Sequence, residues 1–168
     1  EALRLAGYRN YMSGKWHVAS NKNPKGDISG WPIQRGFDRF YGTITGAGSF
    51  YDPATLCRGN TYITPENDPE YKPKSYYYTD AVSDNAATFI ANHAEDKGSA
   101  PKPFFLYVSY TCAHWPMHAP EEDVAKYKGV YDKGYPPIRE ARYKKALALG
   151  VTEKRWPLSK GLSWEKFE

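Results

Sequence analysis

A lysine and a histidine stand two positions apart at the end of a strand-like segment, GYRNYMSGKWH at residues 7–17. The segment predicts a strand over residues 8–12 that enters a turn at Ser13–Gly14. If the chain stays extended, side chains two positions apart lie on the same side. Lys15 would offer an ammonium group that can hold an oxyanion, and His17 an imidazole that exchanges protons near neutral pH. A solvated loop is the commoner explanation for an isolated pair of this kind.

Two further histidines follow a second strand-like run. Residues 104–110, FFLYVSY, are continuously apolar and aromatic, and the loop TCAHWPMHAP after them holds His114 and His118. In open α/β sheets, sites form outside the carboxyl ends of the strands. A lysine and two histidines at one such edge would suit transfer of a tetrahedral anion such as sulfate or phosphate. Rigid proline-fixed turns are the alternative that spacing alone favours.

The elements that would position these groups indicate α/β layering. Residues 79–95 carry apolar side chains at helical spacing, which predicts a helix capped by Thr79 or Asp80. His93 falls at the edge of the apolar stripe, where a structural or surface role is expected. The run at residues 104–110 suits a strand covered on both faces, as in a mostly parallel sheet between helices.

The other segments are less regular. Residues 18–75 show no sustained period and hold Gly, Pro, Asn and Asp between aromatic residues, which predicts a long irregular insertion packed by its own aromatics. Residues 1–6 are expected to be the tail of a helix, residues 121–127 one or two helical turns, and residues 141–149 a short helix closed by Gly150.

Composition and charge exclude several classes of protein. The 168 residues include 23 Lys and Arg against 19 Asp and Glu, and the net charge of +4 is spread out. This argues against a nucleic-acid-binding arm and a polybasic membrane patch, and no apolar run reaches transmembrane length. Cys57 and Cys112 have no metal-ligand spacing. The chain opens at Glu1 inside an apparent helix tail and closes on WEKFE without a terminator, so we expect a piece of a longer protein.

Taken together and in order, these motifs resemble the sulfatase family. Residues 7–17 resemble its signature Ala-Gly-Tyr-x-Thr-x-x-x-Gly-Lys-Trp-His. RGFDRFYG at residues 35–42 and YYTDAVSDNAATFI at residues 77–90 match segments that follow that signature. Residues 103–134 are similar to the strand and loop that carry a second catalytic histidine. The likeness covers nearly the whole chain.

The resemblance implies a fold class and a chemistry. The fold would be part of an alkaline-phosphatase-like α/β/α sandwich, with residues 1–168 forming the middle portion of one catalytic domain. The nucleophile would be a formylglycine made from Cys or Ser, whose hydrate attacks sulfur in a two-step covalent reaction. A divalent metal, calcium by family habit, would help to bind the sulfate. The same habit favours a secreted, periplasmic or lysosomal setting.

Carried over by position, three residues would have catalytic roles. Lys15 would contact the sulfate and the hydrated aldehyde, and His17 would hydrogen-bond that hydrate and assist collapse of the sulfated intermediate. His114 would hold the bridging oxygen of the ester and help to protonate the leaving alcohol.

Substrate contacts are expected from three further residues. His118 would touch the substrate, and Tyr51 with Asp52 would border a sugar-binding cleft. Trp16 and Trp115 flank the site residues and are interpreted as wall and packing residues.

The chain also departs from the family pattern. The nucleophile motif, Cys or Ser followed by x-Pro-Ser/Ala-Arg, is absent, because Cys57 lies in LCRGN and Cys112 in TCAHW. The Asp pair and the Asp-Asn pair that bind the metal are expected outside this sequence. Ser83-Asp84-Asn85 superficially resembles the latter, but a capping role in a helix explains it. We therefore assign no metal ligand to this chain.

Two other classes of function stay open at this point. One is a phosphodiesterase or phosphonate hydrolase of the same superfold, and the other is a non-catalytic carbohydrate-binding remnant that uses the aromatic residues for stacking. A sulfuric ester hydrolase that acts on a sulfated carbohydrate is the favoured hypothesis, and the 168 residues alone are expected to be inactive.

Overall fold

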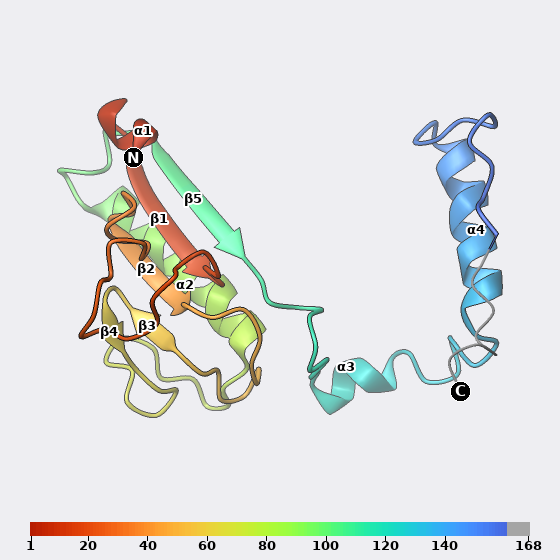
Figure 1. The fold of residues 1–168 in the computed structure, drawn as a ribbon, viewed down its shortest axis with the longest axis horizontal. Coiled ribbons are helices and arrows are strands. Elements are labelled where there is room, and N and C mark those ends of the chain that lie inside the picture. The colour runs from red at the N-terminus through yellow and green to blue at the C-terminus, as the bar shows by residue number, and fades with distance from the viewer. Residues whose placement is uncertain (161–168) are drawn as a thin grey trace. The chain divides into compact units, whose positions relative to one another are not determined.

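A five-stranded sheet with strand order β4-β3-β2-β1-β5 organises the first part of the chain (Figure 1). The computed structural model describes residues 1–160, and the chain divides into two compact units between His118 and Ala119. The first unit carries all the residues that the sequence singled out for chemistry.

Parallel pairing defines the centre of the sheet. β1 (Arg9–Gly14) pairs in parallel with β2 (Arg39–Thr43) on one side and β5 (Phe104–Ser109) on the other. β3 (Leu56–Arg58) and β4 (Thr61–Tyr62) extend the sheet beyond β2 as an antiparallel hairpin. The short helix α1 (Ala2–Leu5) precedes β1, as its sequence predicts.

Helix α2 (Tyr78–Glu95) covers one face of the sheet. Its apolar stripe packs on inward side chains of the strands, and the buried cluster comprises Tyr11, Tyr41, Phe50, Leu56, Tyr78, Ala81, Val82 and Phe89. The predicted helix is thus confirmed, but its predicted cap is wrong. The N-cap is Tyr77, without a side-chain cap hydrogen bond, because the helix begins before Thr79.

The opposite face of the sheet is covered by irregular chain. Residues 18–37 lie over it without a helix, and the buried cluster there comprises Met12, Trp31, Phe40, Ile44 and Cys57. Trp31 is fully buried, and its indole N–H donates to the carbonyl of Asn21 at 2.8 Å. Aromatic residues therefore supply the packing that a second helical layer would otherwise give.

The segment expected to be irregular supplies three of the strands. β2, β3 and β4 all fall within residues 18–75. β2 is only five residues long and contains Gly42, a poor strand former, so its strand character comes from pairing with its neighbours and not from a period in the sequence. The turn predicted at Ser13–Gly14 is also wrong, since both residues belong to β1.

Strand β5 differs from its prediction in burial. It is the last strand of the described sheet, and Phe104, Phe105 and Tyr107 are 40%, 40% and 43% exposed. The expectation of a strand covered on both faces therefore does not hold within residues 1–160. An apolar run indicates a strand, but it does not show which faces of that strand other parts of the protein cover.

His93 has the structural role that its position predicts. It is 6% exposed, its Nδ1 lies 2.9 Å from the Tyr11 hydroxyl, and its Nε2 lies 3.0 Å from the carbonyl oxygen of Lys102. Because a carbonyl only accepts, Nε2 carries the proton and Nδ1 accepts from Tyr11. Both ring nitrogens are satisfied, so this imidazole is an internal link between α2 and the sheet.

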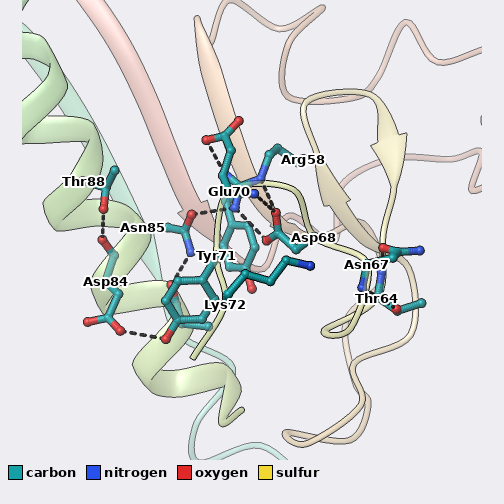
Figure 2. A network of polar contacts seen from close by, with 12 residues as sticks. Arg58, Thr64, Asn67, Asp68, Glu70, Tyr71, Lys72, Asp84, Asn85 and Thr88 are labelled. Carbon is teal, nitrogen blue, oxygen red and sulfur yellow. Dashed lines mark hydrogen bonds and ion pairs between the residues drawn. The ribbon is translucent and has the colours of Figure 1, made fainter. Parts of the chain in front are cut away.

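A buried ion pair fixes the hairpin side of the sheet (Figure 2). The Arg58 guanidinium group donates to both carboxylate oxygens of Asp68, at 2.8 and 2.7 Å, and to the side-chain oxygen of Asn85 on α2, at 2.9 Å. It also pairs with Glu70 at 3.0 Å. The two hydrogen bonds to Asp68 fix the orientation of the guanidinium plane, which a single hydrogen bond would not do.

The Ser83-Asp84-Asn85 run works through this network and not through capping. Asp84 accepts a hydrogen bond from the Tyr71 hydroxyl at 2.7 Å, and Asn85 accepts from Arg58. Ser83 bonds to the carbonyl of Thr79. The predicted capping role is wrong because all three residues lie inside the helix, after its first turn.

The second unit contains two helices within the described residues. α3 (Glu121–Ala125) falls where helical turns are predicted. α4 (Tyr135–Ala148) begins well before the expected residue 141 and includes two prolines in its first turn. Proline is tolerated there because the backbone N–H groups of a first turn have no partner within the helix. No helix among residues 1–160 is long and apolar enough to cross a membrane.

We expect Asp68→Asn to destabilise the protein by about 3 kcal/mol, the scale for removing one partner of a buried ion pair. Burial alone would raise the pKa of Asp68, but hydrogen bonds from Arg58 and backbone N–H groups, with the Arg58 charge, hold it below its usual 3.8. The carboxylate's contribution is therefore present above about pH 4 and is lost as pH falls through the lowered pKa. Urea unfolding of both proteins at pH 7 and at pH 3 measures this.

Glu70→Gln is the matched control, because the Glu70 side chain is 48% exposed and pairs with the same arginine. An exposed pair contributes about 1 kcal/mol or less. Equal losses in the two variants at pH 7 would contradict the assignment of the buried pair as the stabilising one.

Candidate active site

Strands β1, β2 and β5 end close together at the edge where the sequence places the site. The Lys15 N–H donates to the Ser109 carbonyl at 2.8 Å, and the Ser109 hydroxyl donates to the Lys15 carbonyl at 2.7 Å. A Cβ at Gly14 would collide with the Ser109 carbonyl, and one at Gly42 with that of Gly14. Only glycine permits such an approach. Lys15 is thereby fixed to the end of β5, where the loop to His114 begins.

The ammonium group of Lys15 has no protein partner among residues 1–160. The residue is half-buried, and its backbone is held on both sides by Ser109. An unpaired cation on a fixed backbone is available to an anionic ligand. This is the property that the sequence predicts for Lys15.

His17 is held through its backbone and its ring. β1 ends at Gly14 and His17 has a φ of 60°, so strand alternation does not govern its direction. Its N–H donates to the Ile44 carbonyl at 3.1 Å, and its imidazole lies against Gly46, where any Cβ would overlap the ring. Trp16 packs edge-on against Phe37, which confirms its packing role.

His114 is exposed and has one ring contact. Its Nδ1–H donates to the carbonyl of Trp115 at 2.6 Å, and its backbone N–H donates to Thr111 at 2.8 Å. Because the carbonyl can only accept, Nδ1 carries a proton. Nε2 has no partner within the described chain. Trp115 is 73% exposed, so the expectation that it packs as a wall residue is wrong here.

One connection between strands contacts two of the site histidines. Residues 44–55 join β2 to β3, and a 2.7 Å hydrogen bond between the Thr45 and Thr55 hydroxyl groups closes the neck of this loop. Gly46 of the loop supports His17, and the N–H of Phe50 donates to Nδ1 of His118 at 3.3 Å.

Tyr51 and Asp52, two of the three predicted substrate residues, lie in this loop. The Tyr51 ring lies 5.6 Å from that of His118. Asp52 is exposed, and its N–H, like that of Tyr51, donates to the Ser49 hydroxyl at 3.1 Å.

The structure joins some of the predicted residues directly and leaves others apart. His118 contacts Tyr51, and Lys15 is bonded to the end of β5. Within residues 1–160, no hydrogen bond or ring contact joins His114 to Lys15 or His17. Sequence reasoning missed three supports: Ser109, Gly46 and Tyr77. Their only signals are a hydroxyl at a strand end, glycines after a strand, and a tyrosine just before a helix.

The described residues offer no group that fits a metal ion, and their buried cysteine does not fit a thiolate nucleophile. No group of three His, Cys, Asp or Glu among them is placed to hold a metal ion. Cys57 is buried, and burial raises the pKa of its thiol to about 12, so it stays protonated at neutral pH. The chemistry available in these residues is anion binding and proton transfer.

Solved structures share this fold. Ps i-CgsB in complex with k-i-k-neocarrahexaose superposes with a TM-score of 0.60 over 78% of this chain and 30% of its own, at 24% identity. A protein in complex with its substrate D-glucosamine-2-N,6-O-disulfate gives a TM-score of 0.52 over 77% of this chain and 21% of its own. The mixed α/β sheet is therefore part of an alkaline-phosphatase-like fold, as predicted.

Curated relatives carry the name arylsulfatase. The arylsulfatase of Klebsiella aerogenes is 28% identical over 163 residues, which is 94% of this chain and 32% of the relative. Mouse arylsulfatase J is 28% identical over 135 residues, or 77% of this chain and 21% of the relative. The chain thus spans about a third or less of these relatives' length. The family model described as Sulfatase matches residues 1–146. The chain belongs to the sulfatase family.

Proposed function

We propose that this chain supplies the sulfate-binding and proton-transfer groups of a sulfuric ester hydrolase. The observation that carries the proposal is the unpaired ammonium group of Lys15, on a backbone that Ser109 fixes at the point where β5 leads into the His114 loop. The family match over residues 1–146 supports the reaction class. Residues 1–168 would be the middle portion of one catalytic domain.

Lys15 and His17 would bind the transferred group. The positive charge of Lys15 would stabilise a sulfate oxygen, and no existing ion pair among residues 1–160 would have to break first. His17 would hydrogen-bond the attacking group, with its ring direction fixed by contact with Gly46. Pre-set directions matter because an interaction that is already aligned contributes more in the transition state.

His114 would act as the general acid. When the bond between sulfur and the bridging oxygen breaks, that oxygen keeps the electron pair and needs a proton. In the imidazolium form, Nε2–H of His114 would donate this proton and leave the alcohol neutral, while Nδ1–H stays bonded to the Trp115 carbonyl. The carbonyl contact assigns the transferable proton to Nε2.

The substrate is proposed to be a sulfated carbohydrate. Tyr51 and Asp52, in the loop between β2 and β3, and His118, in the loop after β5, would contact its sugar part. The two solved structures with the same fold contain a carrageenan hexasaccharide and a disulfated glucosamine, which supports this class.

The family in general uses a metal ion and a formylglycine. We propose that the metal is calcium, and that its ligands and the formylglycine lie outside residues 1–160. No group of three His, Cys, Asp or Glu among these residues is placed to hold a metal ion, and neither cysteine lies in the nucleophile motif. A secreted, periplasmic or lysosomal setting is proposed on the same family basis.

The direct test is product release by the full-length protein. Incubation with sulfated oligosaccharides of carrageenan, chondroitin and heparin should release inorganic sulfate. Equal or greater release of phosphate from phosphodiesters would support the phosphoryl-transfer alternative instead. Binding without release of either ion would support a carbohydrate-binding remnant.

His114→Ala in the full-length protein should lower kcat for a sulfated sugar about a hundredfold or more, the scale of a general acid. The loss should be much smaller with 4-nitrophenyl sulfate, because 4-nitrophenolate leaves without a proton. Sulfate-release kinetics on both substrates measure this. Met117→Leu, a change at a 74% exposed neighbour, is the control. Identical losses on the two substrates would remove His114 from the acid role.

Gly46→Ala should lower turnover about tenfold or more because the new methyl group displaces the His17 ring from its position, the scale expected for a misplaced catalytic group. Gly48→Ala is the matched control in the same loop, since its Cβ would meet only the Ala54 nitrogen at 3.6 Å. Steady-state kinetics with thermal unfolding separate displacement from instability. Equal activity of the two variants would show that the contact does not position His17.

The isolated 168 residues should hydrolyse no sulfate ester, because their sequence lacks the nucleophile motif and no group of three His, Cys, Asp or Glu among residues 1–160 is placed to hold a metal ion. Sulfate release by this polypeptide, purified alone and assayed with 4-nitrophenyl sulfate, would contradict the expectation. The full-length protein in the same assay is the positive control.

A further inference from the structure

An aromatic cluster lies beside the proposed catalytic groups, in the first unit. The Tyr51 ring lies 5.6 Å from that of His118 at 34° and 5.5 Å from that of Tyr77 at 43°. Beneath them, Phe50 is 2% exposed and contacts both His118 and Tyr77, at 6.0 and 6.1 Å. Tyr51 is 45% exposed, so the cluster has a buried base and an open aromatic surface.

Hydrogen bonds hold this cluster in one arrangement. The Phe50 N–H donates to Nδ1 of His118 at 3.3 Å, and the Tyr77 hydroxyl donates to the His118 carbonyl at 3.1 Å. The Ser49 hydroxyl accepts the N–H groups of Tyr51 and Asp52. The chain before α2 and the β2–β3 loop thus both fasten His118, and a ligand would meet a surface that is already ordered.

The contact with Phe50 determines which nitrogen of His118 faces a ligand as a donor. A backbone N–H can only donate, so Nδ1 bears the lone pair and Nε2 carries the proton. That Nε2–H has no partner among residues 1–160. His118 therefore offers a neutral donor, whereas His114, four residues earlier, binds a carbonyl through Nδ1–H and keeps Nε2 for proton transfer.

These features match the chemistry of a sugar ring. Aromatic faces stack on the apolar C–H face of a pyranose, and a fixed N–H donor suits one of its hydroxyl or ring oxygens. The neighbouring carboxylate of the exposed Asp52 can accept from a hydroxyl group and would repel a second sulfate close by. A ring whose contacting groups are hydroxyls fits this surface better than a second sulfated ring.

We infer that Tyr51, Tyr77 and His118 form a preassembled seat for an unsulfated sugar ring adjoining the sulfate that is cleaved. Tyr51 is the stacking face, Nε2–H of His118 is the donor, and Tyr77 is a positioning residue that holds His118. The inference rests on the proposed function for its substrate, and it assigns specificity for a carbohydrate chain over a small aryl ester.

The test uses the full-length protein and three variants: Tyr51→Ala, Tyr51→Phe and Tyr77→Phe. The probes are 4-nitrophenyl sulfate and whichever sulfated hexasaccharide of carrageenan, chondroitin or heparin gives the highest kcat/KM. Tyr51→Ala should raise KM for the hexasaccharide about tenfold, the scale of one stacked aromatic contact, with kcat unchanged. Its KM for 4-nitrophenyl sulfate should rise much less, because this small ester does not extend over the seat. Met117→Leu, at a 74% exposed residue outside the seat, is the control that should leave both KM values unchanged.

The other variants separate stacking from positioning. Tyr51→Phe keeps the ring, so its KM for the hexasaccharide should rise much less than that of Tyr51→Ala. Tyr77→Phe keeps the ring contact but removes the hydroxyl that binds the His118 carbonyl, so it should raise KM for the hexasaccharide alone. Equal KM changes on both substrates, or no change with the hexasaccharide in Tyr51→Ala, would overturn the seat.

Calorimetric binding separates failure of the seat from failure of the proposed function. If the unaltered protein releases no sulfate, the hexasaccharide it binds most tightly is the probe, and Tyr51→Ala should weaken its binding about tenfold. That result would keep the seat and reject the sulfatase activity. Absence of binding to all three hexasaccharides would reject the seat.

Discussion

The close approach of three strand ends is the constraint on which the site depends. Gly14 and Gly42 remove the side chains that would separate β1, β2 and β5, and the two hydrogen bonds between Lys15 and Ser109 then close the gap. The lysine that follows is carried on rigid parallel strands instead of a free loop. Sites built on regular elements hold their geometry better than sites on loops, and an anion-binding cation gains most from that precision.

The two histidines of the loop after β5 illustrate how the backbone assigns roles to identical side chains. A carbonyl beside His114 requires a proton on Nδ1, and an N–H beside His118 forbids one. The first ring therefore leaves Nε2 without a partner in the described chain, where the proposed proton transfer would occur, and the second presents an Nε2–H donor for the proposed recognition. The four-residue spacing of the two histidines does not predict their tautomers, because each tautomer depends on which main-chain group the ring contacts.

Local patterns predicted the parts of the fold that local chemistry determines. The period of α2, the apolar run of β5 and the order of the motifs around Lys15 and His114 were readable because each is a continuous stretch. Strand β2 was not, since its five residues become a strand only by pairing with β1. The roles of Asp84, Asn85 and Gly46 were not readable either, because each of them contacts a residue that is distant in the sequence. The exposure of β5 likewise depends on which other parts of the chain cover it.

The β2–β3 loop links the anion-binding side of the site to the recognition side. It supports His17 through Gly46 and His118 through Phe50, and its neck is closed by Thr45 and Thr55. Its far end enters β3, where Arg58 is anchored by the buried Asp68 and by Asn85 of α2. Through β3, the loop that contacts both His17 and His118 is thus continuous with the hairpin that the buried ion pair at Arg58 fixes.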